Sequence, residues 1–220
     1  MNLFVLARDA RKAAALHCDK HVVKMLLEAV QMLYSALALR GEPVKVGVVL
    51  PSGEVRGPYR PTHVKHPCTL WTAGAETHFE WVVWLARGLS EEYTARYGRT
   101  HLCSYHLEHI VEHVKRGGYP RGMPRRVTAS EWVEWTRGVV GRDAGHKSRV
   151  AEENAPWGTE FGVLAVDASL KGVISRDAET GKADAVETYR RLYGWKADGR
   201  VEMRWRRGAE APAELVAYVG

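Results

Sequence analysis

Hydrophobic positions dominate a long stretch near the start of the chain. Residues 10–39 contain no proline or glycine and consist mainly of helix formers. Asp9 precedes this stretch as a candidate N-cap, and Gly41 and Pro43 follow it, as they often follow a helix. From Val22 to Leu37 nearly every residue is apolar. This pattern predicts a helix that is buried in the core instead of lying on the surface.

The rest of the pattern predicts a mainly α fold in one domain, residues 1–220. Apolar residues at helical spacing, glycine or proline stops and one capping box mark further helices. Val44 to Arg56 reads as a small β-hairpin around a Pro-Ser-Gly turn. The helices are expected at about 69–97, 102–115, 130–140 and 184–195, the last one opened by Asp184 and Glu187. Trp71, Trp81 and Trp84 are expected in the core.

The few polar residues of the buried helix fall on one line. With 100° per residue, His21, Lys24, Glu28, Gln31 and Ser35 lie within about 80° of one another, and His17 continues the line toward the N-terminus. Buried histidine, lysine and glutamate must pair with one another or face a ligand. The stripe therefore predicts either an internal ion-pair network or a catalytic cleft, in which Glu28 and His21 act as acid or base and Lys24 binds an anion.

Charge narrows the choice of partner. The chain carries a net charge of +6 and has a pI near 9.3. Nine Lys or Arg residues and three acids lie between Lys115 and Arg149, so this segment alone accounts for the whole excess. A concentrated basic segment is typical of a polyanion partner, most often nucleic acid, although a solvated basic surface has the same composition. The predicted DNA contacts are Arg121, Arg125, Arg126, Trp132, Lys147 and Arg149.

Two sets of residues resemble known phage proteins. Asp19, His21 and Glu28 fit the pattern Asp-x-His-x6-Glu, which resembles the first helix of the phage pyrimidine-dimer DNA glycosylases. The longer phrases at 18–33, 62–68, 91–98 and 184–190 look like a widespread phage family labelled as pyrimidine-dimer glycosylase-like. The segment from about 117 to 160 has no counterpart there, and it reads as a basic, DNA-contacting insertion.

The resemblance implies a glycosylase-like helical fold, with Glu28 and His21 in the places of the catalytic glutamate and histidine. In those enzymes the glutamate works with the free amine of a small N-terminal residue. Here Asn2 follows Met1, and a bulky second residue should leave Met1 in place. The arginines of the glycosylase helix are also missing, as Leu27 and Gln31 illustrate. The sequence therefore departs from the pattern that imine chemistry requires.

A site that keeps the carboxylate of the helix but lacks the nucleophilic N-terminal amine suits a transfer reaction. We expect an amino acid or amine to displace pyrophosphate from activated 5-hydroxymethyluracil in a flipped-out position of duplex DNA. Residues predicted to be catalytic are His17, His21, Lys24 and Glu28. Those predicted to bind substrate or phosphate are Asp19, Lys20, Gln31, Arg60, His63, Lys65 and His66. The alternatives are a pyrimidine-dimer glycosylase with lyase activity and a non-catalytic DNA-binding protein.

Other features restrict the setting. Three cysteines without a pairing pattern fit a reducing cytoplasm, here that of a phage-infected bacterium. No apolar run of the length of a membrane span and no signal peptide are expected, and so no membrane partner. His17 with His21, and His106 with His109 and His113, have helical metal-ligand spacing, but no HExxH or CxxC framework accompanies them. We therefore expect neither a metal nor a cofactor.

Overall fold

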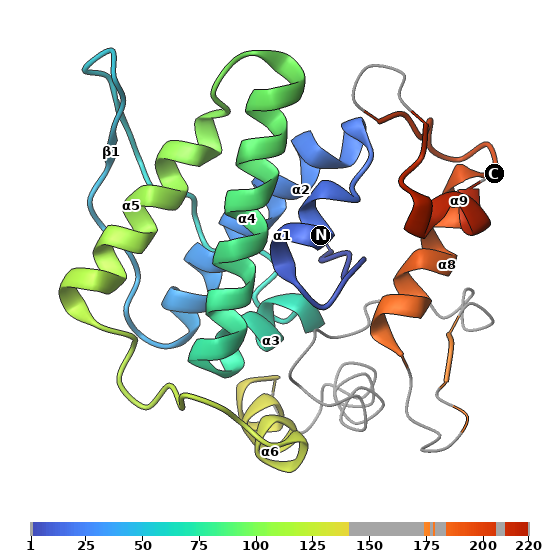
Figure 1. Cartoon of the computed structure of the whole chain (residues 1–220). Coiled ribbons are helices and arrows are strands. Elements are labelled where there is room, and N and C mark those ends of the chain that lie inside the picture. The colour runs from blue at the N-terminus through green and yellow to red at the C-terminus, as the bar shows by residue number, and fades with distance from the viewer. Residues whose placement is uncertain (1, 141–173, 177, 179–183, 206–209, 220) are drawn as a thin grey trace.

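A computed structural model of the chain describes residues 2–140, 174–176, 178, 184–205 and 210–219. Within these residues the protein is mainly helical, with eight helices and one antiparallel hairpin (Figure 1). The predicted mainly α class is therefore confirmed. Lys147 and Arg149, two of the predicted DNA contacts, lie outside the described residues.

The first predicted helix is divided in two. Asp9 caps α1 (Ala10–Ala15), as expected, and α2 (Asp19–Leu39) begins after an extended residue at Cys18. The prediction of one helix across 10–39 was wrong because Arg96 donates to the carbonyls of Ala15 and His17 at the junction. The break changes the direction of the chain before the polar stripe begins.

The second predicted helix is also divided. His66 accepts from the Cys68 N–H and so caps α3 (Pro67–Gly74). Ala75 is extended, and α4 (Glu76–Tyr97) starts with its first N–H donated to the carbonyl of Pro124. Gly98 adopts the left-handed conformation, with φ of 67°, and ends α4 where the sequence predicted.

Helix α2 forms the centre of the core, where it contacts α3, α4 and α5 (Leu102–Gly117). By length and composition this helix could also cross a membrane, but 67% of its apolar window is buried inside the protein, as in a core helix. Trp71 is buried and Trp81 half-buried, as expected for core residues. The same expectation was wrong for Trp84, which is 45% exposed and lies under two arginine side chains.

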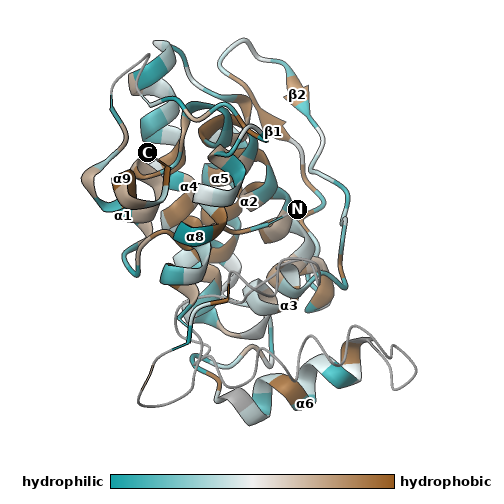
Figure 2. Cartoon of the chain, turned by 90° about the vertical axis from the view of Figure 1, so that its right-hand side faces the viewer, coloured by the Kyte–Doolittle hydropathy of each residue, from teal (hydrophilic) through white to brown (hydrophobic). Residues whose placement is uncertain are grey.

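The hairpin and helix α6, which belongs to the basic segment, lie at the periphery (Figures 1 and 2). Strands β1 (Val48–Val49) and β2 (Val55–Arg56) pair antiparallel, which confirms the predicted hairpin. Helix α6 (Ala129–Val140) packs against α3. Arg40, at the end of α2, donates to the carbonyls of Ala73 and Gly74 and stacks on Trp135, so it ties α6 to the core.

The C-terminal helices close the other side of the molecule. The Asp184 side chain accepts from the Glu187 N–H at the start of α8 (Ala185–Ala197), which confirms the predicted cap. Helix α9 (Ala213–Val219) was not predicted. It packs on α8 at Gly194, where an added Cβ would collide with the Tyr218 carbonyl oxygen. Glycine is therefore required for this close contact.

Candidate active site

The carboxylate of Glu28 lies beside the start of the chain. Glu28 is only 8% exposed, and its Oε2 accepts a hydrogen bond of 2.7 Å from the backbone nitrogen of Asn2. The ammonium of Lys24, one helical turn earlier, lies 3.6 Å from Oε1. The structure thus brings two predicted catalytic residues together with a third residue, Asn2, from the N-terminal segment.

Asn2 joins three parts of the chain. Its Oδ1 accepts from its neighbour's backbone N–H (Leu3, 2.8 Å), from the Tyr189 hydroxyl of α8 (3.1 Å) and from the Cys68 thiol of α3 (3.4 Å). Burial raises the pKa of the Cys68 thiol to about 12. The thiol is therefore protonated at neutral pH and serves as a hydrogen-bond donor instead of a nucleophile.

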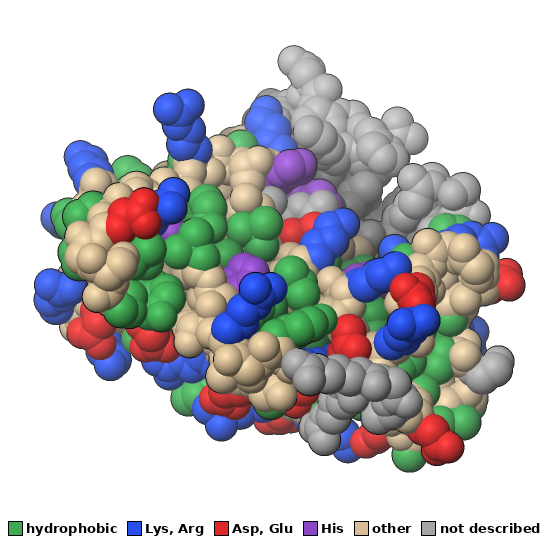
Figure 3. All heavy atoms as spheres, turned by 90° about the horizontal axis from the view of Figure 1, so that it is seen from above, with side chains coloured by type: hydrophobic (Ala, Val, Ile, Leu, Met, Phe, Trp, Pro, Cys, Tyr) green, Lys and Arg blue, Asp and Glu red, His purple; other side chains and the backbone are tan. Residues whose placement is uncertain are grey.

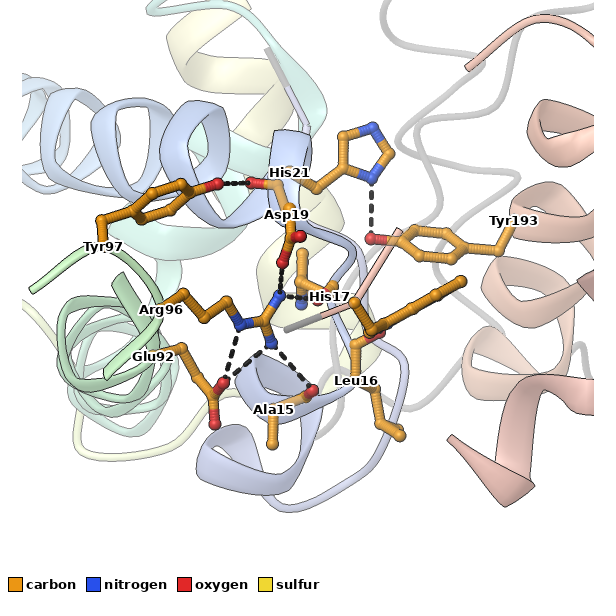
Figure 4. A network of polar contacts seen from close by, with 10 residues as sticks. Ala15, Leu16, His17, Asp19, His21, Glu92, Arg96, Tyr97 and Tyr193 are labelled. Atoms are coloured by element: carbon orange, nitrogen blue, oxygen red, sulfur yellow. Dashed lines mark hydrogen bonds and ion pairs between the residues drawn. The ribbon is translucent and has the colours of Figure 1, made fainter. Parts of the chain in front are cut away.

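His21 faces α8 as a neutral imidazole. Its Nδ1 lies 2.7 Å from the Tyr193 hydroxyl (Figure 4), and its ring stacks on Phe4 with 4.9 Å between centroids. Burial and, to a smaller extent, the nearby His17, Lys196 and Lys24 together lower the pKa of His21 to about 3. The prediction that His21 titrates near neutral pH was therefore wrong. Its contribution is a neutral hydrogen-bonding ring.

His17 lies behind the site. It precedes α2 and is fully buried, with its Nδ1 2.7 Å from the Ala13 carbonyl oxygen. Burial lowers its pKa to about 4. Its Nε2 has no hydrogen-bond partner among the described residues. The predicted catalytic role does not fit this place, because solvent does not reach the ring.

Asp19 and Lys20 are engaged in ion pairs. Asp19 accepts from Arg96 at 2.8 Å, and Arg96 also binds Glu92, as Figure 4 shows. Lys20 is exposed and lies 3.2 Å from a carboxylate oxygen of Glu202. Both residues were predicted to bind substrate. The structure instead uses the pair at Asp19 to fix the start of α2 against α4.

The loop of residues 60–66, which carries four of the residues predicted to bind substrate or phosphate, reaches the polar stripe of α2. The Ser35 hydroxyl bonds both the backbone N–H and the carbonyl of Thr62, at 3.0 Å each. Gln31, one turn earlier on α2, is half-buried. From this attachment the loop runs to Cys68 beside Asn2, and it exposes the side chains of Arg60, His63 and Lys65. His66 is the exception, because it serves as the cap of α3.

Sequence reasoning missed the contribution of α8. Tyr189, Tyr193 and Lys196 have the spacing i, i+4, i+7 and so share one face of this helix. The Lys196 ammonium lies 5.6 Å from the centroid of Phe4. Burial and the neighbouring Lys24 lower the pKa of Lys196. A capping box followed by this spacing was the available signal for a second functional face.

The basic segment shows a mixture of charges in its described part. Arg121 and Arg126 are exposed, whereas Arg125 pairs with Glu80 and Glu76 at 2.5 and 3.4 Å. On the opposite side of the molecule, which Figure 3 shows from above, Lys and Arg are also mixed with Asp and Glu. Trp132 is 1% exposed and packs on Gly74, so the prediction that it stacks on DNA was wrong.

Histidines at metal-ligand spacing have other partners. The Nδ1 of His106 lies 3.0 Å from the Tyr34 hydroxyl, and the Nε2 of His109 lies 3.0 Å from the Val46 carbonyl oxygen. Within the described ranges no three His, Cys, Asp or Glu side chains converge as a metal site would require.

The site therefore combines a nearly buried carboxylate, two ammonium groups and a neutral imidazole, held between α2, α3 and α8. Comparisons of the chain with protein-family models, curated proteins and solved structures found no match. The chemistry of the protein therefore has to be inferred from the geometry of these side chains. Such a set can accept a proton from a substrate and hold an anion beside it.

Proposed function

We propose that this protein is a DNA-modifying transferase that joins an amino acid or amine to an activated thymine-derived base in duplex DNA. One observation carries the proposal: Glu28 is a nearly buried carboxylate that shares its surroundings with Lys24 and the backbone N–H of Asn2. A general base and a cation side by side are what a displacement with an anionic leaving group needs.

The reaction balances as a displacement on pyrophosphorylated 5-hydroxymethyluracil. The amine nitrogen forms a bond to the C5 methylene carbon, and the bond from that carbon to the pyrophosphate oxygen breaks. Glu28 takes the proton that the amine loses, and pyrophosphate departs with the bonding electrons. Lys24 stabilises the charge on the departing group. The neutral His21 ring orients the substrate by hydrogen bonding instead of moving a proton.

The proposed partners are duplex DNA and a free amino acid or amine, in the cytoplasm of a phage-infected bacterium. Exposed Arg121 and Arg126 and the loop carrying Arg60, His63 and Lys65 are the described cationic or imidazole side chains offered to phosphates. The base has to leave the helical stack before Glu28 can act on it, since the carboxylate is nearly buried.

The test is to incubate the protein with DNA containing pyrophosphorylated 5-hydroxymethyluracil and each amino acid, and then to analyse the nucleosides by mass spectrometry. We expect one new aminoalkylated nucleoside with the wild-type protein. Glu28→Gln keeps the acceptor for Asn2 but cannot take a proton, so its rate should fall by about 10²–10⁴. Unchanged nucleosides across all twenty amino acids would exclude the transferase.

A glycosylase with lyase activity is the second candidate, favoured by the 2.7 Å between the Asn2 nitrogen and Glu28. That nitrogen is an amide while Met1 is attached and becomes a nucleophilic amine if Met1 is removed. The intact mass of the purified protein decides which form exists. Borohydride trapping on dimer-containing DNA should give a covalent adduct only in the second form. A protein that merely binds DNA would show no activity in either assay, and Glu28→Gln would change nothing.

A further inference from the structure

Two helix faces converge on the N-terminal segment. From α2 come His21, Lys24 and Glu28, and from α8 come Tyr189, Tyr193 and Lys196. The segment between them contacts both faces, since Phe4 stacks on His21 and meets Tyr193 edge to face, at 4.9 and 5.4 Å between centroids. Tyr193 and His21 also bond each other directly across the junction.

The positive charge at this junction exceeds the negative charge. Among the described residues, the carboxylate that acts on both Lys24 and Lys196 is that of Glu28, which also accepts from Asn2. Lys196 makes no ion pair within the described residues, and its ammonium lies over the Phe4 ring. The two ammonium groups are close enough for Lys24 to lower the pKa of Lys196. Their repulsion would be relieved by an anion placed between them.

A neutral donor accompanies the two cations. When the Tyr193 hydroxyl donates to Nδ1 of His21, the imidazole proton resides on Nε2, which becomes a donor. The Lys24 side chain is 68% exposed, so the junction is open to solvent on that side. Two ammonium groups and one imidazole N–H suit an anion with several oxygens and more than one charge.

We propose that Lys24 and Lys196 together bind a phosphoryl anion, inorganic pyrophosphate, at the junction between α2 and α8. The choice of pyrophosphate rests on the proposed function, in which this ion is the leaving group. The assignment makes Lys196 a binding residue for the product. It also explains why the half-buried lysine of α8 stands over an aromatic ring instead of beside a carboxylate.

The experiment is a calorimetric titration of the full chain with pyrophosphate, without DNA and at constant ionic strength. Lys196→Met and Lys24→Met each remove one ammonium group at similar length, and each should weaken binding about tenfold. Lys12→Met is the matched control, because it removes an exposed lysine of α1 that pairs with Glu214 and was not predicted to bind substrate. It should bind within about twofold of the wild type.

Failure of either proposal can be recognised separately. No pyrophosphate binding by the wild type, or equal weakening by Lys12→Met, would overturn the anion site even if amine transfer occurs. Pyrophosphate binding that depends on Lys196, without any transfer to DNA, would support the site and remove the transferase. Lys196→Arg keeps the charge and should retain binding within about threefold, whereas a loss there equal to that of Lys196→Met would contradict a role in charge recognition.

Discussion

Two clusters of charge lie near the start of α2, and they differ in how far their charges are paired. Arg96, whose side chain is 1% exposed, binds the carboxylates of Asp19 and Glu92 and the carbonyls of Ala15 and His17. Lys196 of α8 is half-buried at the junction between α2 and α8, and it has no ion pair within the described part of the chain. The first cluster is complete without a ligand, whereas the second carries excess positive charge.

The difference in pairing suggests a structural role for Arg96 and a ligand-binding role for Lys196. A buried charge that lacks a partner costs stability, and proteins retain such a cost mainly where a ligand repays it. Arg96 donates to carbonyl groups at the break between α1 and α2, and so it fixes the orientation of α2, on which Glu28 lies. Lys196 contacts the Phe4 ring but pairs with no carboxylate among the described residues. The contrast predicts opposite consequences for removing each cation.

Removal of Arg96 should have the largest effect. Arg96→Met leaves two nearly buried carboxylates and two carbonyls without their donor, so the free energy of unfolding should fall by about 3–5 kcal/mol. Chemical denaturation measures the loss. Arg87→Met on the same helix breaks a more exposed pair with Glu108 and should cost at most about 1 kcal/mol. Equal losses for the two variants would show that the Arg96 cluster is no more structural than a surface pair.

Local signals in the sequence predicted most of the helices. Asp9, Gly98 and Asp184 were each placed correctly at a helix end because a cap acts through neighbouring backbone groups. The breaks at 16–18 and at Ala75 were missed because their backbone groups bond Arg96 and the carbonyl of Pro124, which are distant along the chain. Such long-range bonds leave no periodic trace in the sequence.

The sequence predicted the α2 side of the candidate site but not the α8 side. The stripe on α2 identified Glu28, Lys24 and His21, since all three lie on one helix and helical spacing reveals a shared face. Lys196 belongs to the same site across more than 170 positions, as the bond between His21 and Tyr193 demonstrates. The glycosylase pattern covered the first helix only, and the phage-family phrase at 184–190 ends before Tyr193 and Lys196. The protonation state of His21 also depended on burial, which a sequence pattern does not give.

The pH dependence of stability tests the contact between the Arg96 cluster and the junction that contains Lys196, because His17 touches both. Its carbonyl accepts from Arg96, and its ring lies near that of His21, with 6.5 Å between the ring centroids. The pKa values of His17 and His21 are lowered to about 4 and about 3, below the ordinary 6.5, so the unfolded chain binds more protons. Stability is therefore lost as the pH falls below about 6.5, by up to about 1.4 kcal/mol per pH unit for each histidine.

Denaturation at pH 6.5 and at pH 5 tests this dependence over a range in which carboxylates of ordinary pKa stay mostly ionised. His17→Gln keeps a donor for the Ala13 carbonyl but cannot be protonated, so the loss between the two pH values should shrink by about 2 kcal/mol or less. His63→Gln removes a solvent-exposed imidazole and should keep the wild-type loss. An unaltered loss in His17→Gln would mean that its ring is accessible to protons in the folded protein.

Replacement of Lys196 should have the smallest effect and the opposite sign. Lys196→Met keeps the packing on Phe4 and removes the repulsion from Lys24, so the free energy of unfolding should stay constant or rise by up to about 1 kcal/mol. At one fixed concentration, pyrophosphate should raise the melting temperature of the wild type more than that of this variant, because the stabilisation grows with the ratio of ligand concentration to Kd and the variant binds more weakly. A loss above about 1 kcal/mol without ligand would place Lys196 with Arg96 among the structural cations. The excess charge at the junction would then no longer indicate a binding site.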